Sequence, residues 1–358
     1  MKLKHIGSLA VAIAMAIPIA ANAQDDLVKM RAGMVSGIDQ IALPIAQEKG
    51  FFEKHGLDVT IAEPFATGVD LLNALQSGVV ETAQVGVPMI GAVVRGMDLV
   101  AFGNYSGSAA QLGSDTTLAV VAREGSGIDP KDLTTIKGKK IATSFGSINH
   151  LHILALIEAA GLDIKDVDLV STPPPDMTVA LLTKGIDAFD TWDPWPIIAL
   201  KDVPGAYQVV RGGNFISYLG FNVAMRDWLE NNGETAEKFL AALSEADQWM
   251  RANPEEAAQV ATRWVPGLDP AVAQEAMKYN VQQTDRRLSA NNYKALDDAV
   301  ATLHRLKFVE SDFDVNKHMD STHIVKVMNQ QPGLFSDLPK ISDDALIGDG
   351  FVYIRKAD

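Results

Sequence analysis

Apolar and polar residues follow two kinds of spacing along this chain. Residues 57–61 alternate between apolar and polar side chains, which is typical of a half-buried strand. Residues 148–160 have helical spacing instead, and Gly161 stands where a helix would end. The same patterns predict strands over 29–35, 81–87, 117–122, 140–143, 167–170 and 187–191, and helices over 41–49, 68–78 and 177–184. Strands that alternate with helices indicate parallel sheets of the α/β fold class.

A mainly helical region follows the two α/β blocks, with helical spacing over residues 236–252, 254–264, 270–280 and 292–306. The second block is too small to hold these helices. We therefore expect the chain to leave the first lobe near residues 118–122 and to return near 219–223. Two crossings make a two-segment hinge. A ligand cleft is expected between the lobes, because ligands of open α/β sheets bind at the carboxyl ends of the strands.

This organisation gives explicit boundaries. The predicted first lobe is discontinuous and comprises residues 24–118 and 223–340, and the second lobe comprises 119–222. A tail over 341–358 contains the short apolar run 351–354, which is either a strand or a segment laid on the surface.

The first 23 residues have the features of a cleaved export signal. Lys2 and Lys4 precede an apolar stretch from Ile6 to Ile19, and Ala21-Asn22-Ala23 fits the small-residue cleavage rule. The stretch is short for a membrane anchor. We expect cleavage after Ala23 and release into the periplasm. The chain has no cysteine, so it cannot carry the lipid of a bacterial lipoprotein.

Composition and charge exclude several classes of protein. The chain has 358 residues, 47% of them hydrophobic, which suits a globular protein of about two lobes. A formal net charge of −14 argues against a nucleic-acid-binding surface. The absence of cysteine excludes disulfides, thiolate metal sites and cysteine nucleophiles. Phosphate-loop, zinc-protease and nucleophile-elbow motifs are absent as well. We expect no enzyme activity, no metal and no cofactor.

Three loops with a hydroxyl and a glycine stand just before expected helices. They are Ser36–Gln40, Ala66–Gly68 and Ser144–Asn149. Helix N-termini offer unpaired N–H groups and a partial positive charge, so they hold anions. Alternatively, Thr67 and Ser147 are only helix caps. Together the loops predict an anion site that needs no Lys or Arg.

The sequence Trp192-Asp193-Pro194-Trp195 is the other unusual stretch. A Trp face packs against an apolar or cationic ligand, and Asp190 or Asp193 can bind an ammonium group. The alternative is a core Trp beside an Asp-Pro turn. Tyr105, Phe145 and Tyr218 are candidate cleft aromatics, and His150 is a candidate hydrogen-bond donor to an anion. We interpret Asp285-Arg286-Arg287 as a solvated surface pair.

Four motifs in this order resemble the periplasmic substrate-binding proteins of alkanesulfonate, taurine and nitrate transporters, a superfamily that includes pyrimidine-precursor binders. The motifs are Gly50-Phe51-Phe52 with His55–Val59, Thr67-Gly68 through Ala74–Gly78, Phe145–His150 with Gly161-Leu162, and Pro174-Pro175 through Gly185–Ala188 with Trp192–Pro194. The similarity covers about residues 28–320. It implies a type II periplasmic-binding-protein fold, closure of a hinge around the ligand, and delivery to an ABC permease.

Family resemblance and residue chemistry together give one set of expected ligand-binding residues: Ser36, Asp39, Gln40, Thr67, Gly68, Val87, Tyr105, Phe145, Gly146, Ser147, His150, Trp192 and Asp193. Val87 departs from the family pattern, since many relatives have Ser or Thr there. Asp39 and Asp190 add negative charge near the cleft, which favours a ligand that carries a cation.

Our hypothesis is a monomer that binds a small zwitterion such as taurine or a related alkanesulfonate. The alternatives are a small nitrogen compound such as a pyrimidine precursor or an amine, an aromatic acid, or a sulfate ester. A sensory binding protein that docks on a receptor is a further alternative. An enzyme similar to the yeast-type pyrimidine synthases is disfavoured, because these use a cysteine-rich motif.

Overall fold

The computed structural model describes residues 27–310 and 313–355, so the predicted export signal lies outside the described residues. The strands are β1 (Val28–Gly33), β2 (Leu57–Ile61), β3 (Thr82–Gly86), β4 (Leu99–Ser106), β5 (Leu118–Ala122), β6 (Lys140–Thr143), β7 (Asp168–Ser171), β8 (Ala188–Trp192), β9 (Tyr207–Arg211) and β10 (Gly220–Met225). They form two five-stranded sheets, in the orders β2-β1-β3-β10-β4 and β7-β6-β8-β5-β9.

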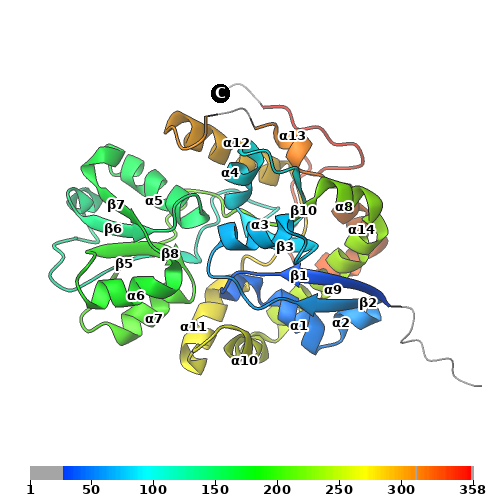
Figure 1. Ribbon diagram of the computed structural model, residues 1–358, viewed down its shortest axis with the longest axis horizontal. Helices are drawn as coiled ribbons and strands as arrows, with labels where there is room; N and C mark the ends of the chain where they lie inside the picture. Colours follow the sequence, from blue (N-terminus) through cyan, green and yellow to red (C-terminus); the bar gives the residue numbers. More distant parts are fainter. Residues whose placement is uncertain (1–26, 311–312, 356–358) are drawn as a thin grey trace, which may run out of the picture.

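Each sheet contains one antiparallel strand that follows a crossing between the lobes. β5 lies antiparallel between β8 and β9, and β10 lies antiparallel between β3 and β4. The chain crosses through residues 107–117 and 212–219, which we call the two connecting segments. Figure 1 shows the resulting lobes side by side. The prediction of two α/β lobes joined twice is confirmed.

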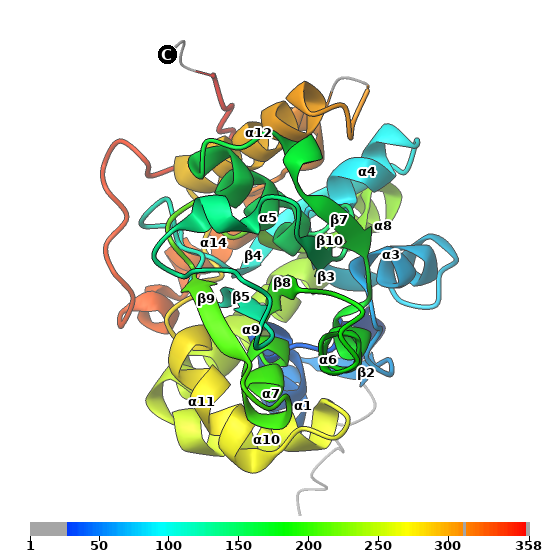
Figure 2. The ribbon, with the colours of Figure 1, turned by 90° about the vertical axis from the view of Figure 1, so that its left-hand side faces the viewer.

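Helices cover both sheets and make up most of the chain after β10. They are α1 (Ala42–Glu48), α2 (Phe51–Lys54), α3 (Gly68–Gln76), α4 (Pro88–Val94), α5 (Ile148–Ala159), α6 (Pro174–Leu182), α7 (Trp195–Asp202), α8 (Arg226–Asn231), α9 (Gly233–Ala252), α10 (Pro254–Trp264), α11 (Pro270–Asn280), α12 (Ala290–Arg305), α13 (Val315–His318) and α14 (Thr322–Gln330). Figure 2 shows α5 on one face of the second sheet, with α6 and α7 on the other. Among the described residues, no helix is both long and apolar enough to cross a bilayer.

The observed elements differ from the predicted ones where the hydrophobic period fails. β4 was not predicted, because all eight of its residues are buried and its sequence has no alternation. α6 begins at Pro174, not near residue 177. Prolines fit the first turn of a helix, where a missing N–H removes no hydrogen bond. The tail has no helix or strand over 341–355.

Apolar side chains of the second lobe pack into the core of the first. Ile148, Leu151 and Trp192 belong to the same buried cluster as the first sheet. Polar contacts join the lobes as well: the Trp192 indole N–H donates to the Ser36 carbonyl (3.4 Å), and Lys201 pairs with Asp269 (2.7 Å). The lobes are therefore closed on each other in this structure.

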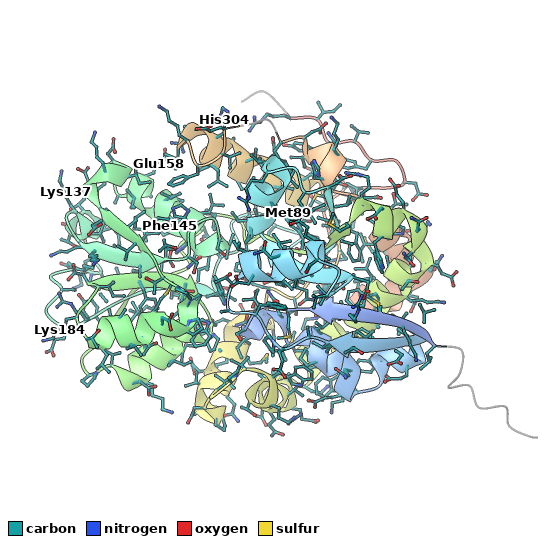
Figure 3. The ribbon with its side chains drawn as sticks, viewed as in Figure 1. Met89, Lys137, Phe145, Glu158, Lys184 and His304 are labelled. Atoms are coloured by element: carbon teal, nitrogen blue, oxygen red, sulfur yellow. The ribbon has the colours of Figure 1, made fainter. Side chains whose placement is uncertain are left out.

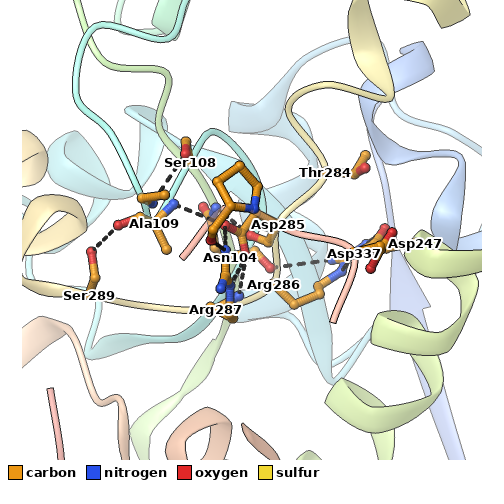
Figure 4. Close-up of polar contacts among 12 residues, drawn as sticks. Asn104, Ser108, Ala109, Asp247, Thr284, Asp285, Arg286, Arg287, Ser289 and Asp337 are labelled. Carbon is orange, nitrogen blue, oxygen red and sulfur yellow. Dashed lines mark hydrogen bonds and ion pairs between the residues drawn. The ribbon is translucent and has the colours of Figure 1, made fainter. Parts of the chain in front are cut away.

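The segment Asp285-Arg286-Arg287 corrects a prediction from the sequence. These residues are at most 6% exposed, so they are not a solvated surface pair. Arg286 forms a buried ion pair with Asp247 (2.6 Å), and Asp285 pairs with Arg287 (2.9 Å). The Asn104 side chain on β4 donates to the Asp285 carbonyl (2.7 Å). Figure 4 shows how these contacts fasten the segment to the first lobe.

Removal of the Asp247 carboxylate is expected to destabilise the protein strongly. Asp247→Asn leaves the guanidinium of Arg286 buried without its counter-charge, which costs about 3–5 kcal/mol in comparable pairs. Urea denaturation measures the loss. Lys278→Ala, which removes an exposed pair with Glu275, serves as the control and should leave the midpoint unchanged. Equal midpoints for the two variants would contradict this role.

A methyl group at Gly37 is expected to push the lobes apart. The added Cβ would lie 2.6 Å from Asp39 Oδ1 and 3.2 Å from Trp192 Nε1, in the contact between the lobes. Overpacking of this kind costs about 1–3 kcal/mol, which disfavours the closed arrangement roughly five- to 150-fold. Small-angle X-ray scattering of Gly37→Ala should give a larger radius of gyration. Gly348→Ala is the control, because its Cβ meets nothing within 4 Å.

Candidate functional site

Two adjoining cavities lie between the lobes, where the carboxyl ends of β1, β3 and β8 meet the start of α5. The inner cavity is small: about 20 Å³ of it is open to the centre of a water-sized group, which is room for about one such group. It is lined by Val35, Asp39, Gln40, Gly68, Gln84, Val85, Gly86, Val87, Pro88, Tyr105, Ser147, Ile148, Trp192, Tyr218 and Leu219. This is the position that the α/β topology favours for a ligand.

The outer cavity shares Gly68, Pro88, Ser147 and Trp192 with the inner one and is larger, with about 200 Å³ open to the centres of water-sized groups. Its other lining residues are rich in hydroxyl groups: Thr67, Val69, Ser144, Phe145, Ser171, Thr172 and Pro173. Figure 3 shows Phe145 on the second lobe and Met89, on α4, on the first. A ligand that reached from one cavity to the other would touch both lobes.

Helix N-termini from both lobes contribute to the outer cavity. Thr67 caps α3: its hydroxyl accepts from Asp70 N–H (3.2 Å) and donates to the Asp70 carboxylate (2.7 Å). Ser147 is the N-cap residue of α5, but its side chain makes no capping hydrogen bond. The Ser147 hydroxyl and the first N–H groups of α3 and α5, which have no partner within their helices, can therefore donate to an anion.

Asp39 supplies the one formal charge among the described residues that line the two cavities. It follows β1 in a short 3-10 turn over Ile38–Gln40 and is 3% exposed. Burial raises the pKa of its carboxyl to about 6, although the Tyr218 hydroxyl, which donates to Oδ2 at 2.8 Å, opposes the shift. Above pH 6 the cavity therefore holds a negative charge that no lining Lys or Arg offsets.

The inner cavity has acceptor atoms without donors. Asp39 Oδ1 is buried and accepts no hydrogen bond of good geometry, although the Asp39 N–H and the Tyr105 hydroxyl lie near enough to the carboxyl to lower its pKa. Gln84, which lines the same cavity from β3, has a buried Oε1 without a partner. Its amide nitrogen already donates to Asn222 (3.2 Å). Buried acceptors without partners are costly, so this end of the site suits a ligand group that donates several hydrogen bonds.

Gln40 holds the Asp39 turn in place. Its Oε1 accepts from Val35 N–H (2.7 Å), and its amide nitrogen donates to the Gln84 carbonyl (3.2 Å) and the Tyr105 hydroxyl (3.0 Å). These bonds use the amide fully, so Gln40 and Tyr105 shape the cavity wall. Burial raises the pKa of Tyr105 well above its usual value, and the phenol is neutral.

Trp192 lines both cavities from the end of β8, and its N–H is held by the Ser36 carbonyl of the other lobe. Ser36 itself does not line either cavity. Val87, at the start of α4, lines the inner cavity and presents no hydroxyl.

Asp193 and His150 are not among the lining residues. The Arg211 guanidinium holds both carboxylate oxygens of Asp193, at 2.9 and 3.1 Å. Burial raises the pKa of Asp193 to about 7, although Arg211 opposes the shift. His150 accepts from Gly146 N–H (3.2 Å) and packs between Phe145 and Phe308. Burial lowers its pKa to about 4, so the ring is neutral, and its Nε2 is buried without a hydrogen-bond partner.

Asp190, the other carboxylate considered for an ammonium group, is buried and paired with His152 (2.7 Å). Tyr218, a candidate cleft aromatic in the sequence, lines the inner cavity. Most of the lining residues of the inner cavity that were not expected are small or apolar, and Gln84 is the polar exception. A Gln in the middle of β3, between Ala83 and Val85, was the available signal for Gln84.

Comparison with known proteins finds relatives that are named as binding proteins. Residues 38–257 match the family model described as NMT1/THI5 like. A Brucella abortus binding protein is 27% identical over 62% of this chain and 66% of its own length. A protein of Escherichia coli named for binding aliphatic sulfonates is 29% identical over 63% and 68%. The nitrate/nitrite binding protein NrtA of Synechocystis is 26% identical over 64% and 56%.

Solved structures share the fold. The alkanesulfonate-binding protein SsuA from Xanthomonas axonopodis pv. citri, bound to MOPS, superposes with a TM-score of 0.73 at 21% identity, covering 83% of this chain and 99% of that one. The desulfurization enzyme DSZB also has this fold, with a TM-score of 0.63 at 14% identity, covering 85% and 99%. The matched sequence spans less than two thirds of the Brucella relative, whereas the fold is shared nearly end to end. This chain has the two-lobed fold of the periplasmic binding proteins and belongs to the NMT1/THI5-like family.

Proposed function

We propose that this protein is the solute-binding component of an ABC importer and that it captures a small zwitterion, with taurine as the best candidate. The protein acts in the periplasm after cleavage behind Ala23, as a monomer that delivers its ligand to an inner-membrane permease. The names of its sulfonate- and nitrate-binding relatives support the transport role. The chemistry of the two cavities supports the choice of ligand.

The observation that carries the proposal is the separation of donors and acceptors along the cleft. Ser147 and the N-termini of α3 and α5 offer donors at the outer cavity. Asp39 and Gln84 offer unpartnered acceptors at the inner cavity. A sulfonate fits the first set and an ammonium group fits the second, with the Trp192 face against the short carbon chain between them.

Simple anions fit this arrangement less well. Nitrate and bicarbonate carry no cation, so they would enter the cleft beside the ionised Asp39 without an offsetting charge. Repulsion between like charges at low dielectric weakens such binding. The ammonium contact moves from Asp193 to Asp39, because Arg211 already donates to both carboxylate oxygens of Asp193.

Closure of the lobes converts binding into a transport signal. A ligand that spans both cavities touches α3 and Asp39 on the first lobe and Ser147 and Trp192 on the second. It favours the closed form only to the extent that it binds that form more tightly. We propose that a permease binds this closed form. A receptor could bind the closed form equally well, so a sensory role is the alternative.

A cationic nitrogen compound, such as an amine or a protonated pyrimidine precursor, is the second candidate. Asp39 beside the Trp192 face favours it, and it needs no helix N-terminus. We propose binding without catalysis: two lining hydroxyls, of Thr67 and Tyr218, donate to carboxylates, but the first bond caps α3 and the second positions Asp39.

Replacement of Asp39 is expected to weaken taurine much more than ethanesulfonate, which lacks the ammonium group. Asp39→Asn removes a buried counter-charge, which costs about 2 kcal/mol or more and so roughly 30-fold in affinity. Isothermal titration calorimetry on ligand-stripped protein measures the affinities of both ligands.

Asp193→Asn is the matched control for this experiment. Because Arg211 occupies the Asp193 carboxylate, the control should change the affinities of both ligands by the same factor. Equal losses for both ligands in Asp39→Asn, or a taurine-selective loss in Asp193→Asn, would refute the contact between Asp39 and ammonium.

The two ligands are expected to respond to pH in opposite directions. The pKa of Asp39 is raised to about 6, so the carboxyl becomes neutral as the pH falls through 6. Protons then compete with the ammonium group, and taurine binding weakens. Ethanesulfonate binding strengthens instead, because its negative charge no longer faces a carboxylate. Titrations between pH 5 and 7.5 check this, and parallel trends for both ligands would contradict it.

A further inference from the structure

His152 lies at the middle of a buried polar cluster that the ligand site does not use. It is on α5, two residues beyond His150, and its side chain is fully buried. Its Nδ1 lies 2.7 Å from Asp190 Oδ2 on β8. Its Nε2 lies 3.0 Å from the Gly212 carbonyl and 3.8 Å from Asp115 Oδ2. The Phe215 ring packs edge-on against the imidazole, with 5.6 Å between the ring centroids.

Both ring nitrogens of His152 face acceptors. A neutral imidazole has one N–H, so it can donate to Asp190 or to Gly212 but not to both. An imidazolium donates to both and offsets the carboxylates of Asp190 and Asp115. The geometry therefore favours the doubly protonated ring.

The acceptors of His152 come from both connecting segments. Asp115 lies on the first segment and Gly212 on the second. Asp115 also accepts the backbone N–H groups of Asn214, Phe215 and Ile216 at 3.0, 2.9 and 3.3 Å, so it holds the two segments together. His152 thus joins α5 to each segment and, through Asp190, to the strand that carries Trp192.

We propose that His152 is a positioning residue for ligand capture: as an imidazolium it fixes α5, with Ser147 at its N-terminus, to both connecting segments. Movement of the hinge then carries the sulfonate-binding end of the cleft and Trp192 as one unit. The role in ligand capture rests on the proposed function. The protonation state of His152 and its contacts with the connecting segments do not depend on that function.

Charged groups around the ring determine the sign of its pH dependence. Burial lowers the pKa of His152, but Asp190, the Gly212 carbonyl and Asp115 together raise it above 6.5. A raised pKa means that His152 carries its positive charge below the folded-state pKa, and the ion pair with Asp190 stabilises the folded protein there as long as Asp190, whose own pKa burial raises, stays ionised. The stabilisation is lost as the pH rises through the folded-state pKa. Alkaline pH is therefore the condition that loosens α5 from the hinge.

The first test measures the state of the ring directly. Nitrogen NMR of protein labelled with ¹⁵N-histidine reports protonation of both ring nitrogens of each His. We expect His152 to be doubly protonated at pH 6.5 and to titrate above that pH. A neutral His152 tautomer at pH 6.5 would overturn the proposal, and this readout needs neither a ligand nor a variant.

The second test measures the geometry of the lobes. The chain has no cysteine, so Lys131→Cys and Glu230→Cys accept two spin labels without competing thiols, one label on each lobe. We expect a narrow distance distribution below the measured pKa of His152 and a broader one above it. In His152→Gln the distribution should be broad at both pH values. Distance distributions that change neither with pH nor with the substitution would contradict the proposal.

The third test uses taurine and ethanesulfonate as probes. His152→Gln should weaken both at least tenfold and by the same factor, because it displaces Ser147 rather than the Asp39 charge. The loss should shrink at pH values above the His152 pKa. His304→Gln is the control, since His304 lies exposed on α12 (Figure 3) and is not part of the cluster. Unchanged affinities in a folded His152→Gln protein would also overturn the proposal.

The outcomes separate this inference from the proposed function. If neither probe binds the unsubstituted protein, the proposed ligand class fails, while NMR and the label distances still decide the state of His152. If His152→Gln does not fold, the pH series on the labelled parent protein decides instead. A distribution that broadens as His152 loses its proton supports the proposal, and one that stays narrow overturns it.

Discussion

A buried carboxylate without a counter-charge in its cavity is the constraint around which the cleft is organised. Asp39 is 3% exposed, and one of its oxygens has no partner. Burial raises its pKa to about 6, so it is ionised at neutral pH at a cost that a suitable ligand removes. The opposite end of the cleft favours a negatively charged group, because helix N-termini concentrate unpaired N–H groups there. A ligand with a cation at one end and an anion at the other satisfies both requirements.

The fold places the acceptors and the α3 N-terminus on the first lobe, and Ser147 with the α5 N-terminus on the second. β1 of the first lobe leads into the turn that carries Asp39, and β6 of the second leads into α5 and Ser147. The chain passes between the lobes twice, so closure brings the two ends together around one axis. In the closed arrangement Trp192 reaches the Ser36 carbonyl across the interface. The His152 cluster lies behind this interface, where α5 meets both connecting segments, and it ties the position of the anion-binding end to the hinge.

The sequence was most informative where local rules decide structure. Strand alternation and the glycines after helices located the α/β units, and the combination of a hydroxyl with a glycine before a helix located the loops around Asp39, Gly68 and Ser147. It failed where tertiary packing decides. Nothing local distinguishes Asp39, which lines the cavity, from Asp193, because the partner of Asp193 is Arg211, 18 residues away on β9. The buried pair of Arg286 with Asp247 looks from the sequence like a surface charge run, since its partner is 39 residues distant.

Calorimetric titration of the ligand-stripped protein at pH 7.5 with taurine, ethanesulfonate and nitrate tests the central claim most directly. The three ligands share a negative end, but taurine alone adds an ammonium group. If the uncompensated charge of Asp39 selects the ligand, taurine binds at least about tenfold more tightly than ethanesulfonate, a difference of about 1.4 kcal/mol, and nitrate binds weakest. Ethanesulfonate or nitrate binding as tightly as taurine would contradict the account, because the cleft would then recognise the anion alone.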